Sequence, residues 1–152
     1  MDLKSLILVF FGGGIGSSIR YLITKYSNKN LISFPIGTSI SNLIGCFIIG
    51  LLIAYYGKND IPKKDIFLFV SIGICGGLTT FSTFILDIFY MVKNENFQNL
   101  ITYFSVNFFI GFFFICLGFL IFKWFTFFLN NSQLWYLKFR YVQKNNTLKL
   151  YT

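Results

Sequence analysis

The chain has 152 residues, of which 55% are hydrophobic, 22% aromatic and only 12% charged, and its mean hydropathy is +0.68. This composition excludes an ordinary soluble globular domain. The formal net charge is +8 and the chain contains no histidine, so the commonest general base and the commonest metal ligand are both missing. Because the five carboxylates are also scattered, the sequence favours a membrane protein that is not an enzyme.

Four apolar windows, each long enough for a transmembrane helix of about 20 residues, follow one another: residues 4–26, 34–56, 65–91 and 98–128. Short polar joints separate them, so successive helices must alternate in direction within one small bundle. The first window resembles the start of a secretory signal, but no small-x-small cleavage site follows, and we interpret it as the first span. The three cysteines fall in three different windows, which disfavours a disulfide or a zinc site.

The fold expected is therefore an all-α membrane protein, with a four-helix transmembrane domain over residues 1–128 and a basic, aromatic tail over residues 129–152. The lysines of the joints divide almost evenly between the two faces of the bundle: Lys4, Lys58, Lys63 and Lys64 against Lys25, Lys29 and Lys93. Since Lys/Arg asymmetry in short loops sets orientation, this chain is expected to insert both ways. The tail adds Lys138, Arg140, Lys144 and Lys149 and is expected to lie on anionic headgroups; no motif supports nucleic-acid binding.

Polar residues in the first two windows are candidate functional positions. In GGGIGSSIRY, Gly12 and Gly16 have the G-x-x-x-G spacing that lets helices approach closely. Arg20 either reaches the membrane surface or faces a water-filled vestibule. In PIGTSISNLIGCFIIG, Asn42 shares one helical face with Thr38 and Gly45. It either joins helices through hydrogen bonds or turns its uncharged amide N–H groups toward an anion.

The third window contains GGLTTFSTF, residues 76–84, in which four hydroxyls and two phenylalanines follow a glycine pair. Adjacent glycines weaken a helix, and a break at membrane depth is tolerated only where it is buried or lines a cavity. Such a break frees carbonyl oxygens, which coordinate Na⁺ in membrane transporters. Phe81 and Phe84 either pack ordinarily or turn their positive ring edges toward a small anion. In the fourth window, Tyr103 and Asn107 share a face that could continue the polar track.

The three quoted stretches, in this order, resemble the CrcB or Fluc family of fluoride channels over residues 5–125, and GICGGLTTFSTF is the most specific of them. The resemblance implies a four-span subunit with a broken third helix that forms an antiparallel, dual-topology homodimer in the inner (plasma) membrane. It implies a fluoride pathway through Asn42, Phe81, Ser82, Thr83, Phe84 and Tyr103, with Arg20 in the vestibule. It also implies a structural Na⁺ at the dimer centre, held by the backbone carbonyls of Gly76 and Thr79.

The residues and the resemblance together predict a fluoride-selective channel that lets fluoride leave the cytoplasm passively and so lowers its cellular concentration. Fluoride is strongly hydrated, so a pore must replace its water with donors and still release it. Two alternatives stay open. A small multidrug-type dual-topology transporter would be expected to carry a carboxylate in its first span, where this sequence has none. A structural membrane assembly subunit would use the small residues and hydroxyls only to hold helices together.

Overall fold

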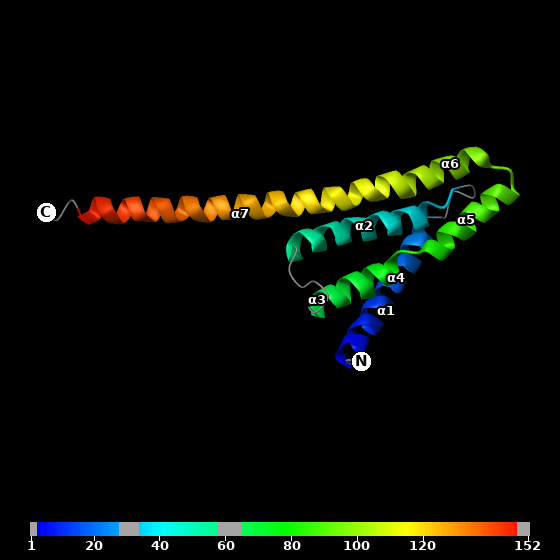
Figure 1. Ribbon diagram of the computed structural model, residues 1–152, viewed down its shortest axis with the longest axis horizontal. Helices are drawn as coiled ribbons and strands as arrows, with labels where there is room; N and C mark the ends of the chain where they lie inside the picture. The colour runs from blue at the N-terminus through cyan, green and yellow to red at the C-terminus, as the bar shows by residue number, and fades with distance from the viewer. Residues whose placement is uncertain (1–2, 28–33, 58–64, 149–152) are drawn as a thin grey trace.

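The computed structural model describes residues 3–27, 34–57 and 65–148, with residues 132–148 described by their backbone only. The first two spans are α1 (Leu3–Ser27) and α2 (Ile36–Tyr56). The third span consists of α3 (Asp65–Phe67), the π-helical η2 (Leu68–Cys75), α4 (Gly76–Leu78) and α5 (Phe81–Lys93). The fourth consists of α6 (Phe97–Ser105), the π-helical η3 (Val106–Ile110) and α7 (Gly111–Leu148) (Figure 1).

Among the described residues, four helical stretches are long and apolar enough to cross a membrane: Leu3–Ser27, Ile36–Tyr56, Asp65–Lys93 and Phe97–Asn131. They agree with the four predicted windows to within a few residues and confirm the prediction of an all-α membrane protein. The boundary predicted after residue 128 falls inside α7, which continues as one helix to Leu148, well past the end of α2 (Figure 1). The division into a transmembrane domain and a tail stays a prediction, and Lys149 lies outside the described residues.

The spans alternate in direction, as their short joints predict. Lys4, at the start of α1, pairs with Asp65 at the start of the third span, and Gly12 packs against Gly73 further along both helices. The first and third spans are therefore parallel. By the same reasoning the second and fourth spans are parallel, because they meet first at residues 42 and 107 and again at residues 50 and 115.

Glycines allow these parallel pairs to approach closely. A Cβ added at Gly16 would overlap the carbonyl oxygen of Ile74, and one added at Gly12 would lie 2.9 Å from the Cα of Gly73. A Cβ at Gly50 would likewise overlap the carbonyl oxygen of Ile115. The predicted packing role of Gly12 and Gly16 is therefore confirmed.

Candidate functional site

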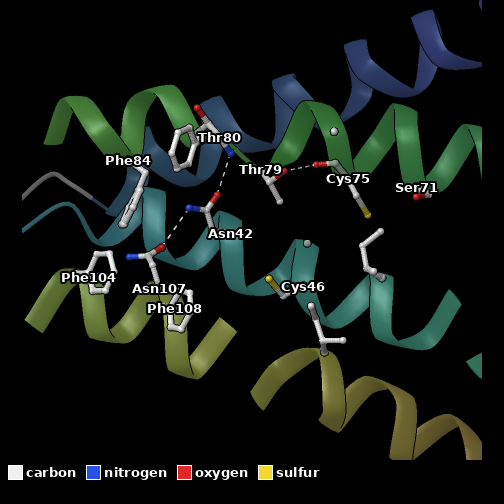
Figure 2. Close-up of a pocket in the computed structure, with 15 residues that line it drawn as sticks. Asn42, Cys46, Ser71, Cys75, Thr79, Thr80, Phe84, Phe104, Asn107 and Phe108 are labelled. Atoms are coloured by element: carbon white, nitrogen blue, oxygen red, sulfur yellow. Dashed lines mark hydrogen bonds between the residues drawn. The ribbon is translucent and has the colours of Figure 1, made fainter. Parts of the chain in front are cut away.

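An open groove of about 670 Å³ lies between the second, third and fourth spans (Figure 2). Its lining is uncharged and mostly apolar, and consists of Asn42, Gly45, Cys46, Ile49, Ser71, Cys75, Gly76, Thr79, Thr80, Phe81, Phe84, Phe104, Asn107, Phe108 and Ile115. Six residues predicted to have a functional role are thus brought together here: Asn42, Gly76, Thr79, Phe81, Phe84 and Asn107.

Two residues with extended backbone, Thr79 (φ −81°, ψ 154°) and Thr80 (φ −149°, ψ 118°), separate α4 from α5 beside the groove. Gly76, part of the glycine pair where the sequence predicts the weak point, is helical. Packing and capping account for this difference. A Cβ at Gly77 would overlap the carbonyl oxygen of Gly13 in α1, so this glycine serves helix contact. The side chain of Thr80 accepts from the amide of Thr83 at 3.2 Å and thereby starts α5.

The extended residues redirect two backbone amides. In a continuous α-helix the carbonyl of Gly76 would accept from the amide of Thr80, and that of Thr79 from the amide of Thr83. The Thr80 amide donates instead to Oδ1 of Asn42 at 2.9 Å, and the Thr83 amide donates to Oγ1 of Thr80. Within the described part of the chain, both carbonyls therefore lack the amide that a continuous helix would supply. Oxygen atoms released in this way suit a hard cation.

Asn42 joins three spans through its amide. Its Oδ1 accepts from the Thr80 amide, and its Nδ2 donates to Oδ1 of Asn107 at 3.2 Å (Figure 2). Asn107 donates in turn to Oγ of Ser39 at 3.0 Å and to the carbonyl oxygen of Tyr103 at 2.9 Å. Asn42 therefore does join helices, one of the two roles predicted for it, and its second Nδ2 hydrogen has no acceptor within the described part of the chain.

Aromatic rings form one wall of the groove. The ring centroids of Phe81 and Phe84 are 6.2 Å apart, those of Phe84 and Phe104 are 6.4 Å apart, and Phe104 stacks on Phe108 at 5.8 Å. Phe81 is 75% exposed, so most of this residue is uncovered in a single chain. The two predicted phenylalanines thus lie on one face of α5, at the groove, as their spacing predicts.

Ser82 and Thr83 lie in the first turn of α5 and do not line the groove themselves. Their hydroxyl oxygens lie within hydrogen-bond distance of Oγ1 of Thr80, at 3.3 Å for Ser82 and 3.1 Å for Thr83. They therefore form a small hydroxyl cluster around a residue that does line it. The helix N-terminus at this point adds a partial positive charge.

Tyr103 and Arg20 lie outside the groove. Tyr103 is fully buried behind Phe84, with ring centroids 5.1 Å apart, and its hydroxyl donates to Oδ2 of Asp87 at 2.8 Å. Arg20 donates from Nε to the carbonyl oxygen of Gly77 at 3.0 Å. The predicted pathway role of Tyr103 and the predicted vestibule role of Arg20 stay predictions.

Three hydrogen bonds in and beside the groove were not predicted from the sequence. Asp87 accepts from Tyr103 and also from Oγ1 of Thr38 at 3.1 Å. Its charge could have indicated a role for Asp87 in the sequence, because an ionisable residue inside a predicted span marks a candidate site by itself. The partnership of Asn107 with Asn42 had no local signal, since it depends on how the second and fourth spans pack.

The comparisons with known proteins agree with one another. The family model described as CrcB-like protein, Camphor Resistance (CrcB), matches residues 7–119. A fluoride-specific ion channel FluC of Azobacteroides pseudotrichonymphae is 36% identical over 124 residues, which cover 81% of this chain and 99% of that protein. The FluC protein of Phocaeicola vulgatus is 38% identical over 117 residues, covering 76% of this chain and 96% of that protein. The chain belongs to the CrcB family of membrane proteins.

Proposed function

We propose that this protein is a fluoride-selective channel that lets fluoride leave the cytoplasm passively. The observation that carries the proposal is the groove in which an uncharged amide, the two threonines of the interrupted third span and two phenylalanine rings meet, in a chain whose relatives are named fluoride-specific ion channels. Amide N–H groups, hydroxyls and ring edges can each replace water around a small anion. Because none of them carries a full charge, the anion is also released.

The conducting form is an antiparallel homodimer with two pathways in the plasma (inner) membrane. Phe81 is largely exposed and the groove is open in a single chain, and an ion pathway of this kind cannot face lipid. A second copy covering the groove would close it. The even division of joint lysines supports opposite insertion of the two copies.

A structural Na⁺ fits the interruption of the third span. Gly76 and Thr79 offer carbonyl oxygens, because the amides that would bond to them in a continuous helix donate to other acceptors. A second copy would offer two more carbonyl oxygens. When bound, the ion supplies a fixed positive charge that holds the carbonyls together. In this proposal the broken third helix serves the ion site, while Asn42, Phe81 and Phe84 serve fluoride.

The direction of fluoride flow follows from the membrane potential. The membrane potential of a cell is negative inside, so a passive pathway moves fluoride outward. Hydrogen fluoride enters as the neutral acid and dissociates in the cytoplasm, so passive export is enough to lower the internal fluoride concentration. The sequence carries no G-x-x-x-x-G-K-[ST] nucleotide-binding motif that would favour ATP-driven transport.

The test is fluoride efflux from liposomes that contain the purified protein, followed with a fluoride electrode. Chloride-loaded liposomes give the selectivity control, and protein-free liposomes give the leak. We expect rapid efflux of fluoride and none of chloride. A correctly folded dimer that passes neither ion would refute the channel and favour a structural role.

A further inference from the structure

At the groove, a chain of hydrogen bonds links the fourth span to the second and the second span to the third. Nδ2 of Asn107 donates to the carbonyl oxygen of Tyr103 at 2.9 Å, and Oδ1 of Asn107 accepts from Nδ2 of Asn42 at 3.2 Å. Oδ1 of Asn42 accepts from the amide of Thr80 at 2.9 Å. Figure 2 shows Asn107, Asn42 and Thr80 in line along the groove.

The two ends of this chain fix its direction. The carbonyl of Tyr103 can only accept, so the part of Asn107 that faces it must be the NH₂ group, and Oδ1 must face Asn42. The backbone amide of Thr80 can only donate, so the part of Asn42 that faces it must be the oxygen, and the NH₂ group must face Asn107. Both ends demand the same orientation of the two side-chain amides.

Each hydrogen of the Asn107 NH₂ group has a partner, because the second donates to Oγ of Ser39 at 3.0 Å. Asn42 differs. One of its Nδ2 hydrogens goes to Asn107, and the other has no acceptor among the residues that the structure describes. Asn42 lines the groove beside Phe81 and Phe84, so this hydrogen is a donor available at the groove.

We infer that Asn107 is a positioning residue for Asn42. Thr80 alone would hold the Asn42 side chain at one point and leave the amide plane free to swing about that contact. Asn107 supplies the second point, and Ser39 and Tyr103 hold Asn107 in turn. This inference rests on the proposed function, since the fixed N–H matters only if an anion enters the groove.

Serine at position 107 should partly replace asparagine. Its hydroxyl can donate to the carbonyl four residues earlier, which is that of Tyr103, and its oxygen can still accept from Asn42. Alanine can do neither. Comparing these two variants therefore separates the hydrogen-bonding role of Asn107 from its volume.

The experiment measures fluoride efflux per reconstituted dimer as a function of fluoride concentration, with the fluoride-to-chloride flux ratio, for the wild type, Asn107→Ala and Asn107→Ser. Thr102→Val is the matched control, because this exposed hydroxyl of α6 donates to the carbonyl of Gln98 in its own helix. For Asn107→Ala we expect the apparent fluoride affinity to fall about threefold to tenfold, the effect of one lost hydrogen bond, with a lower flux ratio. Asn107→Ser should lie closer to the wild type, and Thr102→Val should match it.

A purely structural role would lower the number of assembled dimers and leave the affinity and the flux ratio of each dimer unchanged. Wild-type affinity and ratio in Asn107→Ala dimers, or equal losses in the alanine and serine variants, would overturn the inference. If the alanine variant does not assemble, Asn107→Leu, which fills the site without a hydrogen bond, replaces it. Absence of fluoride flux in the wild type would instead refute the proposed function, whatever the variants do.

Discussion

Arg20 of α1 donates from Nε to the carbonyl oxygen of Gly77 at 3.0 Å, a hydrogen bond between the first and third spans. In a continuous helix this carbonyl would accept from the amide of Phe81. The extended residues Thr79 and Thr80 carry Phe81 out of reach, and the guanidinium supplies a donor in its place. A side chain of the first span therefore stabilises the interruption of the third span.

Arg20→Gln should lower the free energy of unfolding by about 1.5–3 kcal/mol, the usual contribution of a hydrogen bond to a charged group. Arg20→Lys keeps the charge but replaces the planar donor with a compact ammonium, so it should recover only part of the loss. Denaturant unfolding of the assembled protein measures both. Lys25→Gln, an exposed cation 5.9 Å from the Tyr21 ring centroid, is the control; equal stability of Arg20→Gln and Lys25→Gln would contradict the support role.

Phe81→Ile and Phe84→Ile should each abolish most fluoride efflux while leaving the dimer intact. Isoleucine keeps an apolar side chain at the groove but has no positive ring edge to offer an anion. Phe89→Ile, on the same helix, 59% exposed and outside the groove lining, should conduct normally. Efflux assays measure the flux, and size-exclusion chromatography shows whether the dimer is intact. Normal efflux with isoleucine at position 81, or loss of assembly without loss of flux per dimer, would exclude a pathway role.

The four spans could be predicted from sequence because bilayer thickness imposes their length and lipid imposes their composition. Close packing of α1 against another helix was also predictable, since G-x-x-x-G spacing acts locally, but the spacing does not say that the partner is the third span. The site itself depends on contacts between distant residues. The sequence places the weak point at the Gly76–Gly77 pair, yet Thr79 and Thr80 are extended, because the contact of Gly77 with α1 and the cap formed by Thr80 outweigh glycine propensity.

The pairing of Asn42 with Asn107 and the π-helical segments η2 and η3 had no local pattern to predict them. They arise from the registers of packed spans: η3 contains Asn107, and η2 ends directly before Gly76. Such wide helical turns recur at functional sites. Here they flank the groove on both the third and the fourth span.

Gly16→Ala should destabilise the protein strongly, because the added methyl group would overlap the backbone carbonyl of Ile74 in η2 and crowd the amide of Leu78. Backbone atoms cannot move aside as a flexible side chain can, so overpacking of about 1–3 kcal/mol is expected. Gly14→Ala is the matched control in the same helix, since nothing lies within 4 Å of its added Cβ. Thermal unfolding of both variants should show a large loss for the first and little for the second. Comparable midpoints would mean that α1 does not pack as described.

Removal of Na⁺ should abolish fluoride efflux if the carbonyls of Gly76 and Thr79 bind this ion. We expect liposomes prepared with N-methylglucamine as the sole cation to lose efflux, and added Na⁺ to restore it in a saturable way. Potassium, which is larger, is the control and should restore it poorly. Dimers that stay fully conductive after rigorous Na⁺ depletion would rule out a required central sodium.

Deletion of residues 132–152 should leave fluoride efflux per dimer unchanged. The residues that line the groove lie between positions 42 and 115, and the family match ends at residue 119, so both precede the deletion. Efflux and dimer content of the truncated protein should equal those of the full chain, measured in the same liposomes. Liposomes with and without anionic lipid add a second comparison: if the basic tail lies on headgroups, the truncated protein loses only a dependence on anionic lipid. A truncated dimer that assembles but does not conduct would place the tail in the permeation machinery.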